Sequence, residues 1–158
     1  MATKYIDLST VKFFMNNVQE LEAVLEKDRF VDHDLESVDL YVDSVKQFAD
    51  RELFPYFKEM DENPAHYKDG TIHVHQQAEK MMKEGGSMGL ISAPFDYENG
   101  GLQLPLIVHT AANYILDAAN NHLPGYSGLT SGAAELIVQF ANKDLKEKYT
   151  PKMLAGEW

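Results

Sequence analysis

The chain contains no cysteine, and this absence removes several classes of chemistry at once. Disulfide bonds, cysteine-ligated zinc, iron–sulfur clusters and thiol nucleophiles are all excluded. Basic residues are also scarce, because 14 lysines and arginines stand against 25 aspartates and glutamates, for a formal net charge of −11. Since phosphate contacts dominate affinity for nucleic acids, this charge argues against DNA or RNA as a partner. It disfavours an anionic membrane surface for the same reason.

Long apolar runs are missing as well. No stretch of the sequence reaches the roughly 18 apolar residues that a membrane-spanning helix needs. Residues 1–7 lack the basic start, apolar stretch and cleavage site of a secretory signal peptide. We therefore expect a cytoplasmic protein, and the absence of cysteine agrees with a reducing compartment. A secreted protein without disulfides would have the same composition.

What the chain does contain is enough for one domain, or for one domain with a terminal arm. It has 158 residues, of which 44% are hydrophobic and 25% charged, as in ordinary globular proteins. A chain of this length buries roughly 70% of its unfolded surface, so its core needs no metal or disulfide. We find no internal repeat and no low-complexity tract in the sequence.

Apolar residues recur at helical spacing along nearly the whole chain. The clearest stripe contains Val38, Val42, Val45 and Phe48, with charged residues on the opposite face. We predict about six helices and no β-strand, that is, an all-α bundle in which each amphipathic face packs against another helix. The predicted helices begin near Thr10, Val38, His73, Pro105, Pro124 and Asn142.

Capping and breaking residues mark the ends of the predicted helices. Ser9 or Thr10 fits the N-cap of the first helix, and Asn142 fits that of the last. Pro55 should kink or stop the second helix. Gly85-Gly86 should stop the third.

The predicted helix after Pro124 has unusually little side-chain volume. Gly128, Gly132, Ala133 and Ala134 all lie in it. A glycine inside a helix costs about 1 kcal/mol relative to alanine, so two glycines four residues apart indicate that space is required there. Close packing of another helix is the more common reason for such space, and a groove for a ligand is the other.

No group of residues forms a self-contained catalytic, cofactor or metal site. His73-Val74-His75 offers two imidazoles, but residues two apart on a helix point to different faces, so we interpret them as solvated histidines. The adjacent carboxylates Asp61 and Glu62 are interpreted as a solvated acidic turn. Asn99-Gly100-Gly101 lacks the lysine and the further glycine of a phosphate-binding loop and indicates a tight turn. Asp69-Gly70 also predicts a turn.

Several segments, taken in order, resemble the N-terminal helical domain of flavin-dependent acyl-CoA dehydrogenases. The segments are FADRELFP (48–55), MDENP (60–64), NGGLQLP (99–105), YSGLTSGAA (126–134) and YTPKMLAGEW (149–158). Their order and spacing together carry the resemblance, which covers nearly the whole chain. Residues 5–25 look like the extra N-terminal helix of the large bacterial members.

The resemblance implies a helical arm over residues 1–34 and the N-terminal α domain over residues 35–158. In the family, a β domain and a second α domain follow, and the flavin motif and the catalytic glutamate lie in those later parts. On this expectation the chain is the excised N-terminal domain of a larger enzyme, inactive alone and without bound flavin. Such a domain should expose apolar surface that its missing neighbours would cover, near Leu129 and Trp158.

The implied reaction is the α,β-dehydrogenation of an acyl-CoA thioester, with FAD accepting the hydride in the full-length enzyme. The helix over residues 126–134 is then expected to line the acyl end of the substrate cavity. The residues expected to bind substrate are Tyr126, Gly128, Leu129, Thr130 and Ala133. The expected partners are acyl-CoA, an electron-transfer partner and further copies of the chain. The alternative is a stand-alone acidic helical interaction module without enzymatic activity.

Overall fold

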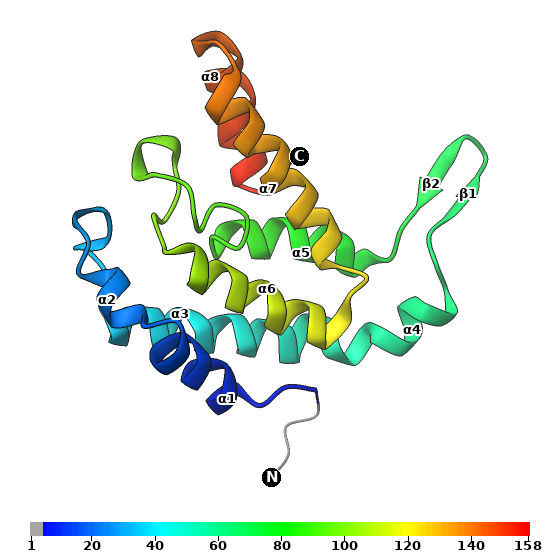
Figure 1. Cartoon of the computed structure of the whole chain (residues 1–158). Coiled ribbons are helices and arrows are strands. Elements are labelled where there is room, and N and C mark those ends of the chain that lie inside the picture. The colour runs from blue at the N-terminus through cyan, green and yellow to red at the C-terminus, as the bar shows by residue number, and fades with distance from the viewer. Residues whose placement is uncertain (1–4) are drawn as a thin grey trace.

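The computed structural model describes residues 5–158, and helices dominate it (Figure 1). The all-α class predicted from the periodicity is confirmed, because the described residues contain only one small two-stranded sheet besides the helices. The α-helices are α1 Leu8–Phe13, α2 Leu21–Leu25, α3 Leu35–Phe48, α4 Phe57–Glu62, α5 Gln76–Ser87, α6 Leu106–Asn120, α7 Pro124–Phe140 and α8 Lys143–Leu154.

Helix α3 forms where the sequence pattern was strongest. Asp34 caps it, since its carboxylate accepts from the Ser37 backbone N–H at 2.7 Å while the Ser37 hydroxyl accepts from the Asp34 N–H. Val38, Val42, Val45 and Phe48 are buried, as their spacing predicts. Helix α3 lies beside α6, and the N-terminal arm packs on the same core through Val11, Met15 and Leu21 (Figure 1). The division at residue 34 remains a prediction, because arm and helices share this core.

Helix α3 changes geometry before Pro55 rather than at it. A π-helical turn covers Ala49–Leu53, and a 3₁₀ turn covers Phe54–Tyr56 before α4 begins. The proline has no backbone N–H to donate, and it lies in the first turn of the 3₁₀ segment, where that N–H is not needed. The predicted kink therefore takes the form of a change in helix type.

Three local predictions were wrong, each for an identifiable reason. The N-cap of α1 is Asp7, whose carboxylate accepts from the Ser9 N–H and both neighbouring hydroxyls, so the charged acceptor wins over Ser9 and Thr10. Gly85-Gly86 lies inside α5, which continues to Ser87. His73 belongs to a strand, and α5 begins only at Gln76.

The prediction of no β-strand was also wrong, because a β-hairpin lies between α4 and α5. Strands β1 His66–Lys68 and β2 Thr71–His73 pair antiparallel around Asp69-Gly70. Both turn residues have positive φ, of 50° and 82°, which is the geometry of a two-residue hairpin loop and confirms the predicted turn. The hairpin projects away from the helices (Figure 1), and all six strand residues are exposed. Because neither face of the hairpin is buried, its strands lack the alternation of apolar and polar residues from which a strand is predicted.

A buried carboxylate joins α5 to the segment that follows α3. The Glu52 side chain is only 8% exposed and accepts from Arg51 at 2.6 Å, Lys80 at 2.9 Å and the Gln77 amide at 3.0 Å. The Lys80 ammonium, followed by the Arg51 guanidinium, lowers the pKa of Glu52 to about 2. The Gln77 amide also donates to the Glu52 carbonyl at 2.9 Å, so the network ties side chains and backbone together.

Replacing Glu52 with glutamine should lower the free energy of unfolding by about 2 kcal/mol at pH 7, because charge-assisted hydrogen bonds to a buried group are lost. A carboxylate whose pKa is lower in the folded state stabilises that state at pH values above the pKa it has in the unfolded chain. That contribution disappears as the pH falls from about 4.5 towards about 2. The difference between wild type and Glu52→Gln, measured by urea unfolding, should therefore shrink between pH 7 and pH 3.

The matched control is Glu62→Gln, which removes an exposed carboxylate paired with Lys58 at 3.6 Å. An exposed pair of this kind contributes little, so no more than about 0.5 kcal/mol is expected. A Glu52→Gln effect that stays constant with pH would show that the loss comes from packing rather than from charge.

Candidate functional site

All five residues predicted to bind substrate lie on α7. Pro124 occupies the first turn of α7. Backbone N–H groups in a first turn have no partner within the helix, so the missing N–H of proline costs no hydrogen bond. Helix α7 rises from the end of α6 and packs chiefly against α8 and α5 (Figure 1). A helix turns about 100° per residue, so the five residues cannot all share one face.

The inner face of α7 is built from small residues. Ser127 and Ala134 are buried, and the Ser131 hydroxyl donates to the Ile91 carbonyl at 3.0 Å. Ala134 lies in a cluster with Ile91, Phe95 and Leu154. The small inner face brings α7 close to the segment after α5 and to α8, and Val138 packs on the edge of the same cluster.

Those large residues form an exposed apolar stripe on the outer side of α7. The exposed fractions are 80% for Leu129, 65% for Leu136 and 83% for Phe140. The stripe consists of Tyr126, Leu129, Ala133, Leu136 and Phe140, at alternating spacings of three and four. Together with Trp158, which is 51% exposed, it confirms the expected apolar surface near Leu129 and Trp158. A 3–4 repeat of this kind is typical of a face that packs against another element.

Gly128 lies beside this stripe and not on it. It precedes Leu129 by one residue, which is a rotation of about 100° around the helix axis. Gly132 follows four residues later and lies nearly above Gly128. A Cβ built on either glycine meets nothing within 4 Å. Among the described residues, close helix packing therefore does not account for the two glycines.

The structure thus divides the five predicted residues into two sets. Tyr126, Leu129 and Ala133 belong to the apolar stripe, with the half-buried Thr130 beside it. Gly128 faces the open side with Gly132. The sequence reasoning did not extend the site to Leu136, Phe140 and Gly132, although the spacing of three and four was present as a signal.

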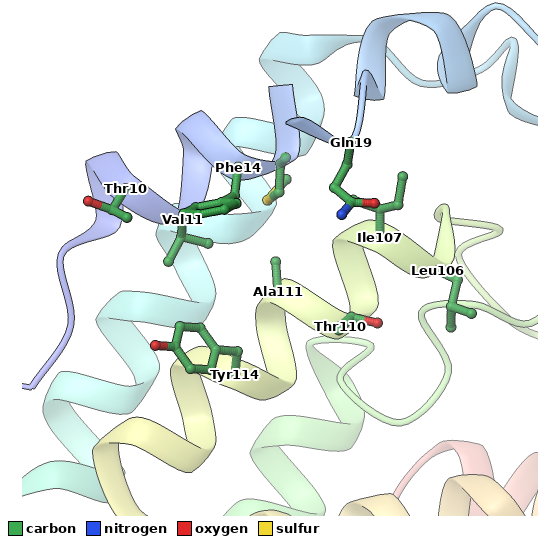
Figure 2. A pocket seen from close by; sticks show the side chains of 10 residues that line it. Thr10, Val11, Phe14, Gln19, Leu106, Ile107, Thr110, Ala111 and Tyr114 are labelled. Carbon is green, nitrogen blue, oxygen red and sulfur yellow. The ribbon is translucent and has the colours of Figure 1, made fainter. Parts of the chain in front are cut away.

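A separate cavity of about 500 Å³ lies between the N-terminal arm and α6 (Figure 2). Phe14 from the arm and Leu106 and Tyr114 from α6 border it, and Thr10, Gln19 and Thr110 add neutral polar groups. None of the five predicted residues lines this cavity.

Metal and membrane features are absent from the part of the chain that the structure describes. Residues 5–158 contain no group of three or more metal-ligating side chains placed to hold an ion. Over the same residues, no helix combines the length and the apolar character required to cross a membrane. Burial lowers the pKa of His109 on α6, which favours the neutral imidazole, and its Nε2 accepts a hydrogen bond from the Asn113 side-chain amide at 3.0 Å.

The fold of packed helices, with a helix that keeps large apolar side chains exposed, defines a helical domain with an uncovered apolar face. The family model for the acyl-CoA dehydrogenase N-terminal domain matches residues 36–157, and the chain belongs to this family.

Two curated relatives carry names from the same family. The chain is 24% identical to a butyryl-CoA dehydrogenase of Syntrophomonas wolfei subsp. wolfei over 155 residues, which cover 94% of this chain and 25% of that protein. It is 27% identical to a probable acyl-CoA dehydrogenase of Bacillus subtilis over 92 residues, covering 58% of this chain and 16% of that protein. The chain thus spans a quarter or less of the length of these relatives.

Proposed function

We propose that this chain is the N-terminal α domain of an FAD-dependent acyl-CoA dehydrogenase, and that α7 supplies one wall of its acyl-binding pocket. The whole enzyme would oxidise the α,β bond of an acyl-CoA thioester. The flavin would take the β hydride, and a carboxylate outside residues 1–158 would take the α proton. The domain's own contribution is to bind and orient the acyl chain.

The open space over Gly128 and Gly132 is the observation that carries the pocket assignment. An acyl chain needs an apolar wall that it can approach closely, and two glycines four residues apart leave a strip of helix surface without side chains. Because no side chain of the described residues fills this strip, it is free for a ligand or for polypeptide outside the chain. Gly128 would then set the depth of the pocket.

The apolar stripe of α7 would serve the same pocket from its edge. Large side chains such as Leu129, Leu136 and Phe140 fill space and do not leave a hollow. We propose that they pack against the rest of the enzyme and exclude water from the acyl chain. Tyr126, Thr130 and Ala133, on the side of the stripe away from the glycines, would border the pocket rather than form its floor.

The test is the spectrum of the full-length protein that contains this domain. Purified full-length protein should show flavin absorbance, and adding acyl-CoA without an electron acceptor should bleach it. The isolated residues 1–158 should bind no flavin. Full-length protein without flavin or bleaching would overturn the proposal and favour the alternative, a stand-alone acidic interaction module.

The remaining expectations follow from the same proposal. An electron-transfer partner would reoxidise the flavin, and the exposed apolar stripe would favour self-association of the isolated domain. A cytoplasmic location fits the absence of cysteine. Sedimentation of residues 1–158 as a monomer at every concentration would argue against a role of the stripe in association.

A further inference from the structure

Two histidines that are seven residues apart in the sequence come together on one face of the projecting β-hairpin. His66 and His73 are direct cross-strand partners at the open end of the hairpin, the end away from its turn. Their ring centroids are 5.3 Å apart, and the ring planes differ by 18°. The Asp69-Gly70 turn fixes the register, so the two imidazoles are held opposite one another by the backbone.

We propose that His66 and His73 form a binding site for a divalent transition-metal ion such as Zn²⁺, which would clamp the open end of the hairpin. Imidazole nitrogen is a preferred ligand of Zn²⁺, Ni²⁺ and Cu²⁺ and a poor one for Mg²⁺ or Ca²⁺. A tetrahedral zinc ion bound at about 2.0–2.1 Å by each ring needs ligand nitrogens roughly 3.3 Å apart. Side-chain rotation of two exposed, directly opposed histidines can reach that spacing. Water would complete the coordination.

One acidic side chain shares the space around the two histidines. An open hollow of about 440 Å³ is lined by His66, His73 and Glu62, and the Glu62 carboxylate also lies 3.6 Å from the Lys58 ammonium. Lys68 is two residues along the same strand, and its ammonium opposes a bound cation from the turn end of this face. His75 is engaged elsewhere, because its Nδ1 accepts from the Gln77 N–H at 3.2 Å and its Nε2 lies 3.2 Å from a Glu59 oxygen. The site is therefore limited to two protein ligands.

The hairpin itself has a use for such a clamp. Two-stranded hairpins without a buried face are marginally stable in water. Tyr67 and Ile72, on the opposite face from the two histidines, are 74% and 68% exposed, so the helices give the strands little support. An ion bridging the strands at their open end would restrict separation of the two strands.

The experiment is an isothermal titration of Zn²⁺ into residues 1–158. The protein is first treated with a chelator to remove bound metal, and the chelator is then removed. One equivalent should bind, and ring-nitrogen NMR should show His66 and His73 shifting together. Replacing either histidine with asparagine should weaken binding about tenfold or more, since a second ligand on the same scaffold acts at high effective concentration. Amide exchange in residues 66–73 should slow when zinc is added.

The matched control exchanges Ile72 and His73 in a double variant, Ile72→His with His73→Ile. Composition, strand propensity and histidine count are unchanged, but the imidazole moves to the opposite face of the strand. Binding should fall to the level of the single variants. Undiminished binding in this variant, no binding by the wild type, or zinc shifts confined to other histidines would each overturn the proposal.

Discussion

Replacing Gly86 with alanine is expected to destabilise the chain by about 3 kcal/mol, the largest stability effect of any glycine substitution in its helices. A Cβ on Gly86 would overlap the backbone carbonyl of Ala155, where the chain leaving α8 lies against α5. Backbone atoms cannot move aside as the tip of a flexible side chain can. At the same contact, a Cβ on Gly156 would overlap the backbone carbonyl of Met82, and Gly156 has a φ of +73°. The contact between the end of α5 and the residues after α8 therefore requires glycine on both sides.

Gly128→Ala is the matched control for this prediction. The two substitutions gain the same helix propensity, about 0.5–1 kcal/mol, but the new Cβ at position 128 meets nothing within 4 Å. Chemical denaturation should therefore show Gly128→Ala as slightly more stable than wild type and Gly86→Ala as much less stable. Shifts of equal sign and size would mean that α5 and α8 do not approach as closely as described.

The second large effect concerns substrate choice in the full-length enzyme. Gly128→Leu should lower kcat/KM for the longest accepted acyl-CoA about 10- to 100-fold and leave the shortest nearly unaffected. The reason is that a leucine side chain displaces about three methylenes of the acyl chain from the pocket. The measurement is kcat/KM across a series of straight-chain acyl-CoA substrates of increasing length.

Ala133→Leu adds a side chain to the other side of the same helix and serves as the comparison. It should change the chain-length profile less, because position 133 lies on the apolar stripe and not over the glycines. A larger change at 133 than at 128 would place the acyl chain along the stripe. An unchanged profile in both variants would contradict the assignment of α7 to the pocket.

Sequence periodicity was sufficient to predict a helix where only one of its faces is buried and where the capping residue is adjacent in sequence. Helix α3 and the buried stripe at Val38, Val42 and Val45 follow directly from it. The cap of α8 was also predicted, since the Asn142 side chain accepts from the Leu145 N–H at 3.0 Å. Such features depend on residues within one or two turns of each other, which are visible in any short window of sequence.

Periodicity and capping residues could not predict the hairpin or the ends of α5. Three-residue strands with no buried side carry no alternation, and the pairing of His66 with His73 arises only from the register across the turn. Gly85-Gly86 has the composition of a helix stop, but Gly86 instead lies against the backbone of Ala155 and Gly156, just after α8 and some 70 residues away in sequence.

The sequence by itself determined the helical class, the family resemblance and the presence of both apolar and small residues on the helix after Pro124. Only the tertiary structure decided which of those residues face inward. Spacing fixes angular positions around a helix, but it does not say which side meets another element. In α7 the small residues Ser127 and Ala134 are buried, while Leu129 and Phe140 are exposed. The face that meets α5 and α8 carries mostly small side chains, with Val138 at its edge, and the apolar stripe lies on the other side of the helix.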